Sequence, residues 1–202
     1  MGRIAKILGF IRTTSFGAQA SDVKVDAGGG DIILAPHFGS PGEDAHPLPG
    51  DYSATVETPR GGGAVSVGYV DPKNEQTAQP GERRTYARNE QGQRVCQVWL
   101  KSDGTILIEN GVASTTMAPD GTVTTTNDNV TLELTALGAG SIVNSAGFLE
   151  LEAGGDVVAN GAKITTGGDV ITAAGISLDN HTHAQGSDSA GNTQAETEAP
   201  TA

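Results

Sequence analysis

Apolar and polar residues alternate in short segments through the C-terminal half of this 202-residue chain. Val130, Leu132 and Leu134 alternate with threonine and glutamate, and segments 106–109 and 149–152 have the same pattern. A period of two is typical of β-strands that bury one face. Turn-forming residues separate the segments: Asp103-Gly104, Asn110-Gly111, Asp120-Gly121, Asn127–Asn129, Gly138, Gly147, Gly154-Gly155, Asn160-Gly161 and Gly167-Gly168. The pattern therefore predicts a succession of short strands and tight turns over residues 95–178.

Each predicted strand carries one narrow apolar stripe, with mainly threonine and acidic residues opposite. A single chain cannot bury such stripes, because isolated hairpins are barely stable and open sheet edges invite aggregation. Three copies around one axis would direct the stripes inward as a three-sided prism. The sequence thus favours an intertwined trimeric triple-stranded β-helix as a shaft over residues 95–178. A right-handed single-chain β-helix is the competing geometry, with about four coils of roughly 20 residues each.

The N-terminal half predicts a small all-β domain over residues 20–94. Turns rich in glycine and proline separate its candidate strands, which are Asp22–Val25, Asp31–Ala35, Tyr52–Glu57, Ala64–Val70 and Arg84–Arg88. Five short strands in about 70 residues fit a barrel of the oligonucleotide/oligosaccharide-binding (OB-like) type.

The first residues have a different spacing. Apolar residues recur at intervals of three and four, at Ile4, Ile7, Leu8 and Ile11. This is the spacing of one helix face, so a short N-terminal helix or arm is expected over residues 1–19. Because a small β-domain has little else to cover that face, a partner protein is the expected contact.

Composition sets this chain apart from an ordinary compact domain. Glycine accounts for 29 residues and aromatic residues for only 4 % of the chain. Small residues at regular spacing favour an elongated fold with close backbone approaches. The formal net charge is −12. Such a surface repels nucleic acid and anionic lipid headgroups, so no nucleic-acid partner is expected.

The basic cluster and the single cysteine are interpreted as structural. Arg83, Arg84 and Arg88 form the one basic cluster, which indicates a solvated strand face. Cys96 is the only cysteine, so an internal disulfide is excluded, and its strand-like surroundings predict an inert core residue. No apolar run approaches the roughly 20 residues of a transmembrane helix.

Two histidines end the strand region in the sequence His181-Thr182-His183. Residues i and i+2 of an extended segment project to the same side, so three chains around an axis would bring six imidazoles together. Such a nitrogen set suits a first-row transition metal, with iron favoured over zinc because structural zinc is nearly always four-coordinate. Read alone, the motif also fits a pair of exposed polar residues.

The apolar residues before this motif have the opposite parity. Ile176 and Leu178 would project to one side of the strand, and His181 and His183 to the other. A kink at Asp179-Asn180 is therefore needed to turn the histidines inward. The remaining histidines, His37 and His46, lie in loop-like sequence and suggest no site.

Motifs of catalysis are missing from the sequence. It contains no Gly-x-Ser-x-Gly, no phosphate-binding glycine loop and no His-Glu-x-x-His. Glu150 and Glu152 lie two residues apart on a predicted outer face, where acids keep a shaft soluble. A glycosidase pair is the alternative interpretation. The expectation is a protein that is not an enzyme.

Two stretches of the sequence carry a resemblance to a known family. The first runs from Gly81-Glu82-Arg83-Arg84-Thr85-Tyr86-Ala87-Arg88 through Val98-Trp99-Leu100-Lys101-Ser102-Asp103-Gly104-Thr105-Ile106. The second is Leu178-Asp179-Asn180-His181-Thr182-His183 with Gly186, Asp188-Ser189, Gly191 and Thr193. They resemble, respectively, the barrel-to-shaft junction and the apex of the baseplate assembly protein V spikes of Mu-like and related contractile-tail phages. Ala184 departs from the proline that often follows the second histidine.

This resemblance implies a homotrimer whose N-terminal barrel binds the hub of the tail baseplate. A triple-stranded β-helix and an apex over residues 179–202 would follow, with one iron held on the three-fold axis by His181 and His183 of three chains. The implied function is a central spike at the tip of the virion's tail, which plugs the tail tube and pierces the host outer membrane when the sheath contracts. The residues from about Gln194 onward match nothing in the family and are expected to be mobile.

Two other classes of function stay open at this point. One is a tail fibre that binds a receptor or degrades a host glycan. The other is the tip of a tailocin or type VI secretion device, which shares the spike architecture.

Overall fold

The computed structural model describes residues 2–15, 18–38, 43–58 and 63–199. The ends of the predicted arm and tail, at residues 1, 16–17 and 200–202, lie outside this part, as do positions 39–42 and 59–62 of two predicted turns. Two compact units form, one from Met1–Thr77 with Arg88–Arg94 and one from Ala78–Ala87 with Val95–Ala202. Every regular element in the described ranges is a β-strand, which confirms the all-β class.

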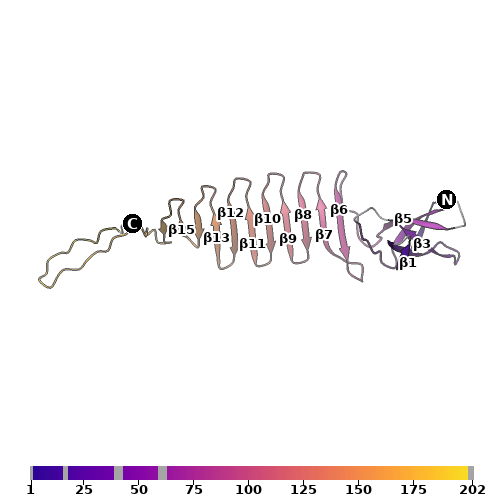
Figure 1. The fold of residues 1–202 in the computed structure, drawn as a ribbon, viewed down its shortest axis with the longest axis horizontal. Helices are drawn as coiled ribbons and strands as arrows, with labels where there is room; N and C mark the ends of the chain where they lie inside the picture. Colours follow the sequence, from indigo (N-terminus) through magenta and orange to yellow (C-terminus); the bar gives the residue numbers. More distant parts are fainter. Residues whose placement is uncertain (1, 16–17, 39–42, 59–62, 200–202) are drawn as a thin grey trace. The chain divides into compact units, whose positions relative to one another are not determined.

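The first unit is a closed five-stranded barrel (Figure 1). Its strands are β1 (Gly2–Ser15), β2 (Ala18–Asp26), β3 (Ile32–His37), β4 (Tyr52–Glu57) and β5 (Ala64–Val70), in the spatial order β1-β2-β3-β5-β4. A parallel contact between β3 and β5 closes the barrel. Ile7, Val23 and Val25 are fully buried inside it, because alternate residues of each strand point inward.

The expected N-terminal helix is wrong, since Gly2–Ser15 forms strand β1 and pairs with both β2 and β4. Ala5 and Ile7 point into the barrel, while Ile4 is 78 % exposed. A bulge after Ile7 then shifts the register, and Phe10 is the next apolar residue against the core. The four residues of the helix-like spacing therefore share no buried face, since Ile7 is buried whereas Ile4, Leu8 and Ile11 are 78, 40 and 48 % exposed.

The expected last barrel strand, Arg84–Arg88, is also placed differently. It forms β6 (Arg83–Arg88), which belongs to the sheet of the second unit. Strand β1 takes the fifth position in the barrel instead. The sequence of a strand does not show which other strand it pairs with. Periodicity alone therefore could not decide whether β1 or β6 belongs to the barrel.

The second unit contains an 11-stranded sheet in which each strand pairs with the next along the chain (Figure 1). Its strands after β6 are β7 (Arg94–Leu100), β8 (Ile106–Asn110), β9 (Ala113–Met117), β10 (Val123–Asn127), β11 (Val130–Leu134), β12 (Gly140–Asn144), β13 (Gly147–Leu151), β14 (Val157–Ala159), β15 (Ala162–Ile164) and β16 (Val170–Ile171). The pairs from β7 to β16 are antiparallel. This antiparallel meander contradicts the single-chain right-handed β-helix, whose coils stack in parallel.

A 17-residue repeat generates the meander. Glycines with φ near +90° recur at Gly104, Gly121, Gly138 and Gly155, and each donates its N–H to the carbonyl three residues earlier. Glycine is required there because other residues are strained at positive φ. At the opposite edge Asn110, Asn127 and Asn144 repeat with the same period, and each side-chain oxygen accepts two backbone N–H groups.

The repeat shortens toward the C-terminus. The next glycines of this turn type, which have positive φ and donate their N–H to the carbonyl three residues earlier, are Gly168 and Gly175, at intervals of 13 and 7 residues. Strand length falls accordingly, from five residues in β8–β13 to three in β14 and β15 and two in β16. The sheet therefore narrows toward the end of the strand region (Figure 1).

A buried ion-pair network joins three segments of the barrel unit. The Arg88 guanidinium donates to both carboxylate oxygens of Asp51, at 2.9 and 2.6 Å, and lies 3.0 Å from Asp71. The side chains of Arg88 and Asp51 are only 13 % and 3 % exposed. The expectation of a solvated basic strand face is therefore wrong for Arg88. Its partners Asp51 and Asp71 lie more than 15 residues earlier in the sequence, so no local sequence pattern reveals this pairing.

The environment of His37 predicts a pH-dependent barrel. His37 ends β3, its ring lies 4.2 Å from that of Tyr69, and its Nδ1 is buried without a partner. Burial lowers the pKa of His37, although a hydrogen bond with the Ser66 backbone opposes the shift. The unfolded chain therefore binds a proton at a higher pH than the folded chain does, and stability falls as pH drops below about 6.5.

The corresponding experiment compares urea midpoints at pH 7.5 and pH 5.0. The wild type should lose more stability over this interval than His37→Gln does. Equal losses in the two proteins would contradict the assignment of this pH dependence to His37.

Candidate functional site

Strand register gathers the apolar residues of the sheet on one side, here named the apolar face. Two rows cross it from strand to strand. Row 1 is Leu100, Ile106, Met117, Val123, Leu134, Gly140, Leu151, Val157, Ile164 and Val170. Row 2 is Val98, Ile108, Thr115, Thr125, Leu132, Ile142, Leu149, Ala159 and Ala162. The predicted alternation is thus present in these strands, with exceptions such as Leu107 and Val143 on the other face, while the inward orientation of the apolar residues stays a prediction.

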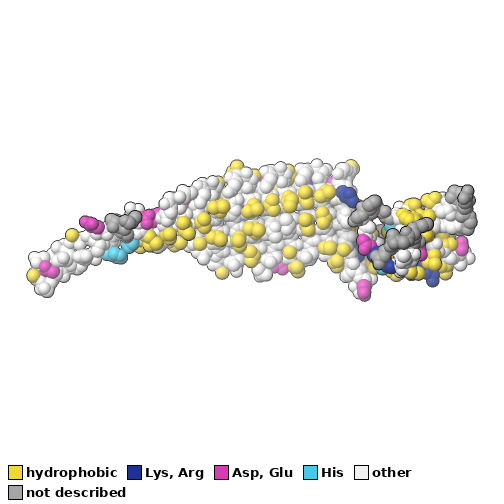
Figure 2. Space-filling view, in the orientation of Figure 1, with side chains coloured by type: hydrophobic (Ala, Val, Ile, Leu, Met, Phe, Trp, Pro, Cys, Tyr) yellow, Lys and Arg dark blue, Asp and Glu magenta, His cyan; other side chains and the backbone are white. Residues whose placement is uncertain are grey.

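The apolar face is uncovered in the single chain. Leu134, Leu151 and Ile164 are each about half exposed, at 51, 47 and 50 %. Figure 2 shows hydrophobic side chains gathered in lengthwise bands over this sheet. Exposed apolar patches beyond a few hundred Å² are rare in monomers and usually mark an interaction site. From β8 to β16 every strand residue of this face is uncharged.

The opposite face, here named the polar face, carries the charged strand residues from β8 to β16, namely Glu109, Glu133, Glu150 and Lys163. Serine and threonine lie beside them, together with some apolar residues such as Val143 and Phe148. Nζ of Lys163 lies 2.9 Å from a carboxylate oxygen of Glu152 and 2.7 Å from a carboxylate oxygen of Asp156. Hydrogen bonding to Lys163 lowers the pKa of Asp156, and hydrogen bonding to Asp156 raises the pKa of Lys163. Glu152 is therefore ion-paired with Lys163 in the structure, and the glycosidase interpretation of Glu150 and Glu152 stays a hypothesis.

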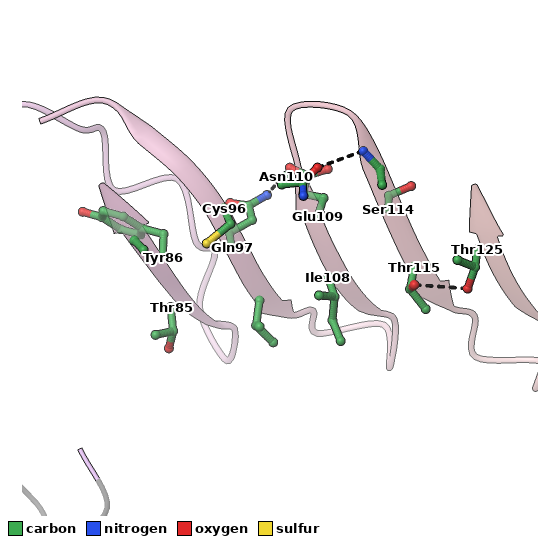
Figure 3. Close-up of a pocket in the computed structure, with 13 residues that line it drawn as sticks. Thr85, Tyr86, Cys96, Gln97, Ile108, Glu109, Asn110, Ser114, Thr115 and Thr125 are labelled. Carbon is green, nitrogen blue, oxygen red and sulfur yellow. Dashed lines mark hydrogen bonds between the residues drawn. The ribbon is translucent and has the colours of Figure 1, made fainter. Parts of the chain in front are cut away.

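Cys96 is exposed in the single chain, so the expectation of a core cysteine is not met there. It lies opposite Asn110 in the β7–β8 register, on the same side of the sheet as Val98. A hollow on this side is lined by Cys96, Val98 and Ile108 among others (Figure 3). The chemical reactivity of the Cys96 thiol can therefore show whether the apolar face is covered.

The two histidines of the predicted metal site lie next to each other after the last strand. The ring centroids of His181 and His183 are 5.0 Å apart, and their planes are nearly perpendicular at 89°. Nδ1 of His181 lies 3.0 Å from the carbonyl oxygens of Ser177 and Leu178. A carbonyl can only accept, so Nδ1 donates and Nε2 remains as the metal-binding nitrogen.

A turn over Leu178–Asn180 supplies the kink that the histidine parity requires. The Asn180 backbone N–H donates to the Ser177 hydroxyl at 3.0 Å, which stabilises the turn. Both histidines then border one hollow with Ile176. Ile176 has the parity of the apolar face, because the bridge between Ile171 and Ser177 sets the register of this last segment.

The chain after the histidines folds back toward them. The Thr197 N–H donates to the His183 carbonyl at 3.1 Å, and the His183 N–H donates to the Thr197 hydroxyl at 2.8 Å. At the far end Asp188 and Gly191 form the same type of glycine turn as the sheet. Thr197 is therefore hydrogen-bonded to His183 beside the apex, while the mobility expected from about Gln194 onward stays a prediction.

One chain supplies part of a metal site at most. Within the described ranges no cluster of three or more histidine, cysteine, aspartate or glutamate side chains is placed to hold an ion. The residues nevertheless fit a shared metal, because two adjacent imidazoles are available and the backbone fixes one tautomer. The remaining ligands of such a metal would have to come from outside this histidine pair.

The comparisons with known proteins do not identify a family. No family model matches the chain, and no curated protein matches it. Among solved structures the chain matches the wild-type TCP10 domain of Danio rerio CPAP with 15 % identity, over 95 % of this chain and 96 % of that one, at a TM-score of 0.31. This score is too low to support a shared fold. Separately, no helix in the described part is long and apolar enough to span a membrane.

The 17-residue period was not recognised from the sequence, although its signal is present. Gly104, Gly121, Gly138 and Gly155 are evenly spaced in the sequence, and so are Asn110, Asn127 and Asn144. Reading these two series together would have predicted a meander of paired hairpins. The interruption of row 2 by Thr115 and Thr125 depends on strand register and needed the structure.

Proposed function

We propose that this protein is the trimeric central spike of a contractile phage tail, with the apolar faces of three copies packed around one axis. The observation that carries the proposal is a continuous, uncharged apolar face, left open by the single chain and narrowing toward a histidine pair. Burial of apolar surface contributes roughly 25 cal/mol per Å², so covering the whole face would stabilise an oligomer strongly.

The chemistry of the two faces favours a second copy as the covering partner. A chain with net charge −12 repels its copies unless the acids stay apart. Here Glu109, Glu133 and Glu150 lie on the polar face, so apolar faces can meet while the acids remain in solvent. The partner must also be as long and as regularly spaced as rows 1 and 2, and another copy of this sheet meets both requirements.

The narrowing sheet supports a three-fold arrangement that ends in a point. Rows of Val, Ile and Leu give way to shorter strands with Ala159 and Ala162, which leave less side-chain volume for the axis. In the proposed assembly the three sheets wind about one another as an intertwined triple-stranded β-helix. Backbone hydrogen bonds within each chain already form the meander, so association needs mainly side-chain burial.

The proposed role combines this geometry with the resemblance to baseplate assembly protein V. The N-terminal OB-like barrel would bind the baseplate hub, and the shaft would plug the tail tube at the tip of the virion. On sheath contraction the trimer would pierce the host outer membrane mechanically, without catalysis and without binding nucleic acid. His181 and His183 of three chains would hold one iron, which as a Lewis acid cross-links the narrowest part.

The decisive experiment is native mass spectrometry with metal analysis of the same sample. The expected species has three times the 20.5 kDa mass of the chain and one iron. Cys96 should react with maleimide only slowly until the protein is denatured, because the trimer covers its side of the sheet. A monomer with a reactive thiol would overturn the proposal. Cleavage of a host polysaccharide would instead indicate a fibre-type depolymerase.

Removal of the histidines tests the metal assignment. In His181→Ala/His183→Ala the bound iron should fall from one per trimer to none, while the shaft remains trimeric because rows 1 and 2 are unchanged. Metal analysis and native mass measure the two results separately. His37→Ala/His46→Ala is the control and should keep its iron. Stoichiometric iron in the apex variant would show that other residues bind the metal.

A further inference from the structure

Two threonines interrupt row 2 of the apolar face. Thr115 of β9 and Thr125 of β10 lie opposite each other in the register, and their hydroxyl oxygens are 3.1 Å apart (Figure 3). Their neighbours in row 2 are Ile108 on one side and Leu132 on the other. The other members of rows 1 and 2 have no polar side-chain atom capable of a strong hydrogen bond.

We infer that the Thr115–Thr125 pair fixes the register in which copies of this chain associate through the apolar face. The inference rests on the proposed self-association and adds the group that makes it specific. One hydrogen bond joins the pair within a chain, but two hydroxyls offer two donors and four acceptor positions. When the face is covered, the remaining donor and lone pairs need partners.

The partners available at a self-association interface are the same pair on neighbouring copies. When the copies are aligned, all six hydroxyls lie at one level and can bond to one another around the axis. When one copy slips, its hydroxyls face Ile108 or Leu132 of another copy and lose those bonds. Buried polar residues are known to fix register in this way in coiled coils, at some cost in stability.

Slippage is a real alternative for this sheet because its hairpins repeat every 17 residues. A shift by one hairpin, about 10 Å along the sheet at roughly 4.8 Å per strand, again places apolar row 1 residues against apolar row 1 residues. Row 1 contains no polar side chain to distinguish these alignments. Within rows 1 and 2, Thr115 and Thr125 are therefore the residues whose polar side chains oppose a shift by one hairpin.

The test measures alignment by spin-label distances between the copies. Labels are attached to Leu137→Cys, at an 85 % exposed position in a turn away from the face, in a Cys96→Ala background. The parent should give one inter-label distance. Thr115→Val/Thr125→Val should remain trimeric and at least as heat-stable, but it should show additional longer distances. In metal-free protein, where no iron at the apex aligns the chains, one slipped alignment of similar energy would lower the population of the original distance about twofold.

Two control variants make the result specific. Thr116→Val/Thr124→Val changes the paired threonines of the same strands on the polar face, and it should keep one distance. Thr115→Ser/Thr125→Ser retains the hydroxyls and should also keep one distance. A single unchanged distance in the Thr115→Val/Thr125→Val trimer would overturn the register role alone. A monomeric parent, with no coupling between labels, would overturn the self-association proposal and this inference together.

Discussion

A single aspartate in the apolar face should abolish the trimer. In Leu132→Asp three carboxylates would be buried around one axis, and each uncompensated charge costs several kcal/mol. Leu132 occupies row 2 between Thr125 and Ile142, near the middle of the sheet. We expect the native mass to fall from three chains to one and Cys96 to become freely reactive.

The neighbouring residue supplies the control. Thr131 points to the polar face, where its hydroxyl lies 2.9 Å from that of Thr126. Thr131→Asp loses this hydrogen bond, worth about 1 kcal/mol, but places its charge in solvent. It should therefore remain trimeric. Equal dissociation of both variants would indicate general unfolding, and a Leu132→Asp trimer would show that this face is not the interface.

Loss of Arg88 should destabilise the barrel unit more than any change to a surface charge. Arg88→Ala leaves Asp51, which is 3 % exposed, without its bidentate partner. Removing one member of a buried pair typically costs about 3–5 kcal/mol. The urea midpoint of the barrel transition should drop accordingly, with little change in native mass because rows 1 and 2 are untouched.

An exposed ion pair in the same unit gives the matched comparison. A guanidinium nitrogen of Arg12 lies 2.6 Å from a carboxylate oxygen of Asp44, but these side chains are 45 and 74 % exposed. Solvent screens such a pair, so Arg12→Ala should change stability by less than about 1 kcal/mol. Similar effects of the two substitutions would mean that the Arg88 network is as weakly coupled as a surface pair.

The candidate site was only partly predictable from the chain. The motif of His181 and His183 is visible in the sequence, and so is the need for a kink before it. The carbonyl contacts that orient His181 depend on the backbone conformation of the Leu178–Asn180 turn, which the amino-acid sequence does not specify. The Thr115–Thr125 pair could not be found either, because it exists only once β9 and β10 are aligned.

The sequence by itself determined the local structure of most of this protein. Alternation of apolar and polar residues defined strands such as Tyr52–Glu57 and Ala64–Val70 with their observed bounds, and Asp-Gly and Gly-Gly pairs located the turns. These features depend on side-chain direction and backbone sterics within a few residues. They can therefore be read without knowledge of the rest of the chain.

Only the tertiary structure decided which strands meet. It placed β1 in the barrel, where a bulge after Ile7 shifts the register of its pairing with β2. It assigned β6 to the sheet and buried Arg88 against Asp51. The physical reason is that strand pairing joins backbone groups far apart in the chain. A strand's own sequence shows which face it buries, but not which neighbour supplies its hydrogen bonds.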